Sequence, residues 1–361
     1  MISNQVLQNT IDGLKNIARV DLCIVDVDGK EVAATADMGE SLKAAVGFAV
    51  SPADSQEIQG YQYFKIFDEQ QLEYVLVAEG AGDDVYMIGK MAAFQLQNLL
   101  VAYKERFDKD NFFKNLLLDN LLLVDIYSRA KKLHISADIP RAVIVIESGE
   151  EQNNGVLELV RTHVGNSCRE FVTAVDEGNV IVVKELTEPD IAKEIERSAK
   201  GLEQLIQKEN FCDIRIAYGT VVRDIKEVSR SYKEAKMALD VGKIFFEERN
   251  VVAYSELGIG RLIYQLPIPL CKMFIREIFG GKSPDDFDEE TLTTILKFFD
   301  NSLNVSETSR QLFIHRNTLV YRLDKLQKSI GLDLRIFEDA ITFRIALMVV
   351  KYMKYMENAD Y

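Results

Sequence analysis

Polar and basic side chains suited to binding nucleic acid are concentrated in one short run near the end of the chain, His315-Arg-Asn-Thr-Leu-Val-Tyr-Arg-Leu-Asp-Lys. Arginine, asparagine and threonine hydrogen-bond to the edges of bases, and arginine, lysine and tyrosine also bind phosphate oxygens. On an α-helix, the first turn of this run is rich in base-reading groups and the later turns in phosphate-binding groups. That order is typical of a helix that enters the major groove with its N-terminal residues.

Two short helices joined by a tight turn are predicted to position these side chains. The first helix is expected from about Ser306 to Phe313, with the Ser306 hydroxyl as its N-cap. In the second helix, Leu319, Leu323 and Leu326 are spaced i, i+4 and i+7, which is the pattern of one buried stripe. The polar and basic residues then lie on the faces that remain open to solvent.

The predicted contacts follow from position along the second helix. Arg316 and Asn317 are expected to contact base edges, and Thr318 is expected to contact a base or a phosphate. The residues of the later turns are expected to bind phosphates. The complete predicted DNA-binding set is Ser306, His315, Arg316, Asn317, Thr318, Tyr321, Arg322 and Lys325.

The same pattern also fits an amphipathic helical hairpin whose basic face is only solvated. The local charge argues against that alternative. Residues 305–328 hold five Lys/Arg and two acids, 5 − 2 = +3, whereas the whole chain carries 43 − 57 = −14. An acidic remainder repels DNA everywhere except at this basic surface, so it would orient the molecule on the duplex.

The stretch Leu312-Phe-Ile-His-Arg-Asn-Thr-Leu-Val-Tyr-Arg-Leu-Asp-Lys-Leu resembles the C-terminal helix-turn-helix of CdaR/PucR-type (sugar diacid utilisation regulator-like) bacterial transcription regulators. The likeness extends over about residues 100–356 and weakly over the first hundred. It implies a ligand-responsive, sequence-specific DNA-binding transcription regulator, expected to be an activator controlled by a small carboxylate or another metabolite. Phe313 stands where many such turns have glycine, and the resemblance does not require a left-handed backbone there.

Length and composition are those of a globular protein with two or three domains: 361 residues, of which 47% are hydrophobic and 28% charged. The four cysteines and three histidines lie far apart in sequence, which argues against a metal site or a disulfide framework. The N-terminus lacks the basic start and apolar run of a signal peptide, and no stretch reaches the roughly 18 apolar residues of a membrane helix. We expect a cytoplasmic protein with no cofactor, metal or membrane partner.

The first 110 residues are predicted to form a small antiparallel sheet flanked by helices. PAS and GAF sensor domains have this α+β architecture, whose concave sheet can enclose a small ligand, and the family resemblance places small-molecule sensing here. The expected order is helix 3–18, strands 19–26 and 31–35, short helix 40–48, strands 61–67 and 72–79, and a long helix.

Tyrosines of this sheet are candidates for binding the effector, together with one lysine that would hold an anion. The alternative is that the tyrosines are ordinary half-buried residues alternating along their strands. The candidate residues are Tyr61, Tyr63, Lys65, Tyr74 and Tyr86.

Residues 84–110 are predicted to form the long helix, followed by a second helix over 111–126 and a third over 125–133. The long helix either forms the interface of a homodimer or higher homo-oligomer and transmits the signal, or only covers its own sheet. The apolar stripe does not follow a regular heptad, so it does not decide between the two. Its members are Met87, Met91, Phe94, Leu99, Tyr103 and Phe107.

Residues 140–256 are predicted to form an α/β domain of order βαββαβ, starting with an apolar strand at 141–147 and closed by a strand at 251–254. The order is similar to a nucleotide-cyclase palm, and the family resemblance implies a degenerate GGDEF-like domain. A working cyclase needs glycines that admit phosphates and paired carboxylates for two metals. The hairpin offers only Asp176-Glu177-Gly178-Asn179, so we expect a structural or dimerising role and no enzymatic activity.

The predicted fold class is multidomain α/β plus α. It comprises a PAS/GAF-like α+β sensor domain (1–110), a helical linker (111–139), a central degenerate GGDEF-like α/β domain (140–256), a connector (257–287) and an all-α helix-turn-helix domain (288–361). The expected partners are double-stranded DNA and an unidentified small-molecule effector. Two other functions stay open: a nucleotide cyclase-type enzyme with an appended DNA-binding domain, and a sensory scaffold that binds protein.

Overall fold

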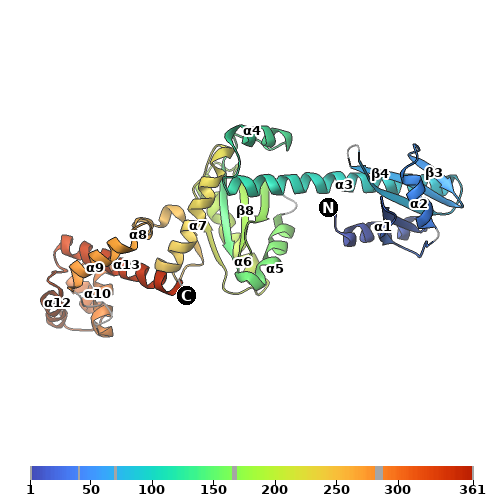
Figure 1. Cartoon of the computed structure of the whole chain (residues 1–361). Coiled ribbons are helices and arrows are strands. Elements are labelled where there is room, and N and C mark those ends of the chain that lie inside the picture. The colour runs from blue at the N-terminus through green and yellow to red at the C-terminus, as the bar shows by residue number, and fades with distance from the viewer. Residues whose placement is uncertain (1, 40, 69–70, 165–168, 281–287, 360–361) are drawn as a thin grey trace. The chain divides into compact units, whose positions relative to one another are not determined.

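The computed structural model describes residues 2–39, 41–68, 71–164, 169–280 and 288–359 of the chain. The chain divides into two compact units (Figure 1). The first contains residues 1–113 and 129–135, and the second contains residues 114–128 and 136–361. The predicted central and helix-turn-helix domains therefore belong to one unit, and the predicted linker 111–139 is divided between the two.

The first unit is built on a five-stranded sheet of order β2-β1-β5-β4-β3, in which every neighbouring pair is antiparallel. The edge strand β3 was not predicted, because its sequence Ser-Gln-Glu-Ile has no alternating apolar pattern. The elements are α1 (Asn4–Ala18), β1 (Leu22–Asp26), β2 (Glu31–Ala34), α2 (Ser41–Ala49), β3 (Ser55–Ile58), β4 (Tyr61–Asp68), β5 (Gln71–Glu79) and α3 (Asp83–Leu117).

This sheet has a hydrophobic core on each face, because successive residues of a strand point to opposite sides. On one face, Tyr63 packs with Phe48 of α2 and with the strand residues opposite it. On the other face, Phe64 packs with Leu7 of α1 and Leu96 of α3. The sheet is thus a central layer between α2 on one side and α1 with α3 on the other.

Helix α3 is one continuous element, so the predicted break near residue 110 is wrong. The helix continues because the residues after its polar stretch include Phe112, Phe113 and Leu116, all of which are buried. A second helix, α4 (Leu123–Lys132), follows it. In the connection, Asp119 pairs with Lys233 of the central domain, which fixes this segment to the second unit.

The central domain is a second five-stranded sheet, of order β10-β9-β6-β8-β7, with β10 parallel to β9 and the other pairs antiparallel. The predicted βαββαβ order with a closing strand is confirmed. Its elements are β6 (Arg141–Glu147), α5 (Gly149–Val164), β7 (Glu170–Ala174), β8 (Asn179–Glu185), α6 (Ile191–Lys208), β9 (Arg215–Tyr218), η1 (Ile225–Glu227), α7 (Val228–Phe245), β10 (Val251–Ala253) and η2 (Tyr254–Glu256).

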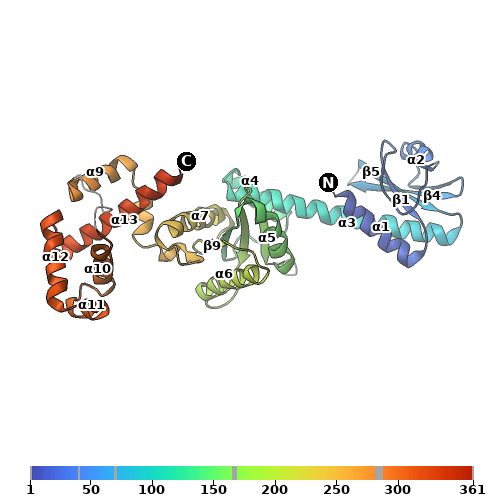
Figure 2. The same cartoon turned by 90° about the horizontal axis from the view of Figure 1, so that it is seen from below.

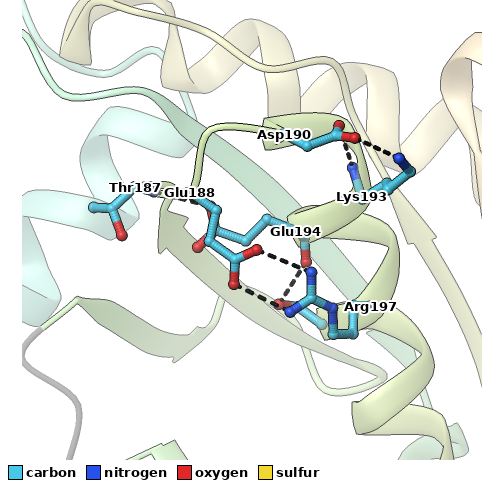
Figure 3. A network of polar contacts seen from close by, with 7 residues as sticks. Thr187, Glu188, Asp190, Lys193, Glu194 and Arg197 are labelled. Carbon is cyan, nitrogen blue, oxygen red and sulfur yellow. Dashed lines mark hydrogen bonds and ion pairs between the residues drawn. The ribbon is translucent and has the colours of Figure 1, made fainter.

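Helices α5 and α6 pack against one face of this sheet, around strand residues such as Ile144 and Val182 (Figure 2). Helix α7 contacts β6 and β9, and the Ser231 hydroxyl accepts a hydrogen bond from the Val143 amide at 3.0 Å. The start of α6 is fixed by the Glu194 carboxylate, which accepts hydrogen bonds from the backbone amides of Thr187 and Glu188, both at 2.9 Å (Figure 3).

The remaining helices form an all-α region with its own core. Phe279 of α9 packs there with Phe298, Leu323 and Phe343, so part of the segment predicted as a connector belongs to this core. Residues 281–287 of that connector lie outside the described residues. The helices are α8 (Gly260–Tyr264), α9 (Ile268–Phe279), α10 (Glu289–Asp300), α11 (Val305–Gln311), α12 (Arg316–Ile330) and α13 (Phe337–Ala359).

Helix α13 takes part in two cores. Its residues Phe343 and Ala346 belong to the core of the helical region. Val349 and Tyr352, farther along the same helix, pack with Ile244 at the end of α7. In the part of the chain that the structure describes, no helix combines the length and the apolar character needed to cross a membrane.

Candidate nucleic-acid interface

Helix α11 begins one residue earlier than predicted. Its N-cap is Asn304, whose side-chain oxygen accepts a hydrogen bond from the Glu307 amide at 3.1 Å. The predicted N-cap Ser306 lies inside the helix, is exposed, and accepts at its backbone oxygen from the Ser309 hydroxyl at 2.9 Å. Both residue types are good N-caps, so only the geometry distinguishes them.

The turn after α11 is a Schellman motif. The Ile314 amide donates to the Ser309 carbonyl at 3.0 Å, and the Phe313 amide donates to the Arg310 carbonyl at 3.2 Å. Phe313 has a φ of 55°, in the left-handed region that this motif usually fills with glycine. The prediction that Phe313 needs no left-handed backbone is therefore wrong, and its side chain is 96% exposed.

The packing between α11 and α12 follows the predicted pattern. Thr308 and Ser309 are buried where the two helices are in contact. On α12, Leu319, Leu323 and Leu326 are all buried in the helical core, as the i, i+4, i+7 spacing predicted. Three leucines on one stripe fix which face of α12 is turned to solvent.

The N-terminal turn of α12 presents a group of exposed polar side chains. His315 is the N-cap, and its Nδ1 accepts a hydrogen bond from the Asn317 amide at 3.2 Å. Arg316, Asn317 and Thr318 are exposed in the first turn, which puts their side chains beside one another on the free end of the helix. This end is positive because its first amide groups have no partner within the helix.

The exposed surface continues along α12 through Tyr321 and Lys325. Tyr321 is 68% exposed although its ring is large and partly apolar. Lys325 is also exposed, about two and a half turns from Arg316. Seven of the eight predicted residues are therefore open to solvent, and six of these seven lie on α12 or its N-cap.

Arg322 is the exception, because its guanidinium is engaged within the helical region. Its Nη1 donates to the Thr294 hydroxyl at 3.0 Å, and its Nη2 pairs with Glu290. The Arg322 side chain is only 19% exposed. In this structure Arg322 joins α12 to α10, so it does not have the free guanidinium that was predicted to bind phosphate.

Two acidic groups lie on α10 and α11, the helices that contact α12. Asp288 caps α10, and its pKa is lowered first by the hydrogen bond from Thr291 and less by the charges of Lys325 and Arg322. On α11, hydrogen bonds from Arg310 and Gln311 lower the pKa of Glu307 to about 2. Both carboxylates are therefore ionised at neutral pH, and that of Glu307 is already paired with Arg310.

The predicted effector residues lie on two different faces of the N-terminal sheet. Tyr63 is buried toward α2 and donates to the Ser41 carbonyl at 3.1 Å. Lys65 donates to the Ser51 carbonyl and lies over the Phe48 ring. The two side chains, with the half-buried Tyr61, thus belong to the packing between the sheet and α2.

Tyr74 and Tyr86 lie on the opposite face, in the core with α1 and α3. Desolvation by burial raises the pKa of both Tyr63 and Tyr74. The five candidates therefore lie on two opposite faces of the sheet and do not face one another. Period-two alternation separates Tyr74 from Tyr63 because Tyr74 is paired with Ile66 across the strands.

The hairpin of the central domain uses its acidic group for structure. Asp176 accepts hydrogen bonds from Asn179 Nδ2 at 2.7 Å and from the Gly178 amide at 3.2 Å, and it pairs with Lys236 at 3.1 Å. Burial acts to raise the pKa of Asp176, but these hydrogen bonds lower it overall. No cluster of three His, Cys, Asp or Glu side chains suited to a metal ion occurs among the residues that the structure describes.

Two segments of the chain match known protein families. Residues 120–241 match the GGDEF-like domain, and residues 291–349 match the PucR C-terminal helix-turn-helix domain. The second match contains α11, the Schellman turn and α12, together with most of α10 and part of α13. The predicted GGDEF-like and helix-turn-helix regions are thus confirmed, whereas neither match extends over the N-terminal sheet.

Three characterised relatives are transcription regulators or regulatory proteins by name. The carbohydrate diacid regulator of Escherichia coli is 26% identical over 61% of this chain and 60% of its own length. The purine catabolism regulatory protein of Bacillus subtilis is 21% identical over 96% of this chain and 71% of its own length. The DNA-binding transcriptional activator AdeR of B. subtilis is 24% identical over 70% of this chain. The matched part spans 63% of AdeR, so two of the three relatives are matched over less than two thirds of their length.

Proposed function

We propose, from the premise that this chain belongs to the CdaR/PucR type of bacterial transcription regulators, that it is a ligand-responsive, sequence-specific DNA-binding regulator. Helix α12 would lie in the major groove of double-stranded DNA. Arg316 and Asn317 would contact base edges, and Thr318 a base or a phosphate. Tyr321 and Lys325 would contact phosphates.

One observation carries this proposal. The three leucines of α12 are buried in one core, while Arg316, Asn317 and Thr318 stand together and exposed at the positive end of the helix. A helix that served only to cover the core would not need these three side chains at its free end. The arrangement is the one by which a recognition helix reads base edges with its first turn.

Selection of bound sequences from a randomised duplex library with the purified full chain tests the proposal. Binding to the selected duplex is then measured by fluorescence anisotropy at several salt concentrations. We expect Arg316→Ala to lose about 1–3 kcal/mol, or roughly 5- to 150-fold, on that duplex because a bidentate base contact is removed.

Arg276→Ala is the matched control, because Arg276 is an exposed arginine of α9 in the same helical region. Its affinity should stay within about twofold of wild type, as expected for a surface substitution away from the contact. The proposal is wrong if no duplex is enriched at low salt, with or without metabolites, or if Arg316→Ala binds the selected duplex as tightly as wild type.

The N-terminal unit is proposed as the PAS/GAF-like sensor domain. Support comes from its single antiparallel sheet with α2 on one face and α1 with α3 on the other, which separates it from the region matched as GGDEF-like. The effector is proposed to be a small carboxylate or another metabolite. Two of the relatives carry names from carbohydrate diacid and purine metabolism, which favours a metabolite over a macromolecule as the signal.

The central domain is proposed to have a structural or dimerising role. Its hairpin carboxylate Asp176 is bound by Asn179 and Lys236, so this carboxylate is already used within the protein. The domain also fixes α13 through the contact with the end of α7. A regulator that must transmit a signal from a sensor domain to a DNA-binding domain can use such a domain as a rigid connection. We also propose a cytoplasmic location.

A further inference from the structure

Helix α3 has two apolar faces, although only one of them packs on its own sheet. Ala92 and Leu96 are buried in the sheet core, and Leu99 and Tyr103 pack partly against it. The opposite face carries a second set of large apolar side chains that are between 56% and 67% exposed: Met87, Met91, Phe94 and Val101. Single exposed apolar residues are ordinary, but a contiguous row of them marks an interaction site.

The exposed row follows a heptad. From Met87 the spacing is four, three, four and three residues, through Met91, Phe94 and Asn98 to Val101. This places Met91 and Asn98 at a positions and the other three at d positions. The sequence alone did not separate this row from the buried one, because the combined stripe mixed residues of both faces. We call Met87, Met91, Phe94, Asn98 and Val101 the α3 seam.

The residues that pack on the sheet occupy the heptad positions farthest from the α3 seam. They fall at b, c and f, so the helix can be covered by the sheet and by a second helix at the same time. These residues are Val85, Tyr86, Ala92, Ala93, Leu96, Leu99, Leu100 and Tyr103. The whole α3 seam lies on one continuous helix within the first unit (Figure 1).

Asn98 identifies the partner. It is exposed and is the one polar residue among the five of the α3 seam. A carboxamide has both donors and an acceptor, so it can hydrogen-bond with the same group of an identical helix. Two copies bring Asn98 against Asn98 only when the helices are parallel and in register, whereas an antiparallel pair sets it against an apolar d residue such as Phe94. A single asparagine at an a position specifies register in this way.

We propose that the α3 seam is a contact between two copies of this chain, which pack as a short parallel coiled coil around Asn98. The contact is isologous, since the same surface of each copy meets its equivalent. The contact itself does not depend on the proposed function. Only its consequence does, namely that two copies of the DNA-binding helix α12 are held in one complex. Two linked readers gain affinity through effective concentration.

Sedimentation velocity of the full chain without DNA tests the contact. Wild type should sediment as a dimer at micromolar concentration, and Phe94→Glu should weaken the dimer by about 100-fold or more, because two carboxylates then face each other in an apolar interface. Phe107→Glu is the matched control: Phe107 is an exposed phenylalanine of the same helix outside the α3 seam. It should leave the dimer constant within about threefold.

Disulfide trapping tests the parallel register. In a background with Cys168→Ser and Cys212→Ser, Asn98→Cys should give a covalent dimer under a mild oxidant, because a parallel pair in register sets each a residue against its equivalent. Phe107→Cys should not, because a residue at a c position lies away from the seam. A monomeric wild type, an unchanged dimer in Phe94→Glu, or no trapped dimer overturns the proposal. Salt-dependent DNA binding measured on the same samples reports the proposed function separately, because a monomer still carries α12.

Discussion

Phe313 combines two properties that are individually costly. Its backbone has a φ of 55°, and its ring is almost entirely exposed to solvent. A left-handed conformation costs a residue with a Cβ about 1–2 kcal/mol, a cost that glycine does not have. Removing the ring should cost little stability, because the exposed ring buries almost no surface that could offset the backbone strain.

We expect Phe313→Gly to raise the free energy of unfolding by about 0.5–1 kcal/mol. The gain is smaller than the relieved strain, because glycine also increases the entropy of the unfolded chain. Thermal denaturation of the full chain checks this against Phe337→Gly, another exposed phenylalanine at the start of α13. A Phe313→Gly protein that is less stable than wild type would show that the ring makes a contact absent from this structure.

The residues of the reading surface could be predicted from the sequence, because they depend on local order alone. The Leu319, Leu323 and Leu326 spacing fixes which face is free, so Asn317 and Thr318 had to be exposed, whereas Arg316 lies at the edge of this stripe and is exposed because it is the first residue of the helix. The state of Arg322 could not be predicted in this way. Its partners Glu290 and Thr294 lie about thirty residues earlier, and nothing in the sequence shows that α10 passes beside α12.

At the scale of elements, substitution of Arg322 should lower stability, whereas substitution of Lys325 should weaken DNA binding. We expect Arg322→Met to lower the free energy of unfolding by about 1 kcal/mol, since charged hydrogen bonds between α10 and α12 are lost while the aliphatic stem is kept. The salt dependence of DNA binding should stay unchanged. Chemical denaturation and the slope of log K against log salt are the measurements.

Lys325→Ala provides the comparison for this pair of helices. Its stability should be close to wild type, and its binding should weaken on all sequences alike with the salt slope reduced by about one. If Arg322→Met also reduces the slope by about one, then Arg322 leaves Glu290 and binds phosphate in the complex. The original prediction for Arg322 would then be correct.

Elements with a strong periodic signal were predictable, and those without one were not. The strand β6 is apolar throughout and fully buried at its centre, so its place in the sheet followed from composition.

The strand β3 is polar and lies at an edge, where Gln59 and Gly60, both with positive φ, form the turn into β4. The Gln-Gly pair was the only local sign of that hairpin. Helix α3 extends beyond its predicted end at residue 110, and the charged run at 104–110 that it crosses contains neither glycine nor proline.

At the scale of the whole molecule, an effector should change DNA affinity. A ligand can shift an equilibrium only by binding the two arrangements differently, and coupling energies between sites are typically about 1–3 kcal/mol. We therefore expect a metabolite that stabilises the full chain against heat to change affinity for the selected duplex by roughly 5- to 150-fold. A metabolite library screened by thermal shift, followed by anisotropy, measures both effects.

A metabolite that does not shift the melting temperature serves as the control for this screen. It should leave the affinity within about twofold, because it has no differential interaction with the protein. A metabolite that clearly stabilises the chain and yet leaves operator affinity unaltered would speak against the sensor and the reader being coupled through DNA affinity.

The double role of α13 also decides where this protein can be recombined with others. A chimeric regulator that borrows residues from Asp288 onward takes the reader without Phe279 and uncovers the side of α13 that bears Val349 and Tyr352. The apolar surface uncovered in such a chimera would make it aggregate and lower its solubility. Gene fusion between relatives should therefore succeed when the crossover falls ahead of β6, so that the DNA-binding region is inherited together with α7 and with the central sheet on which α7 packs.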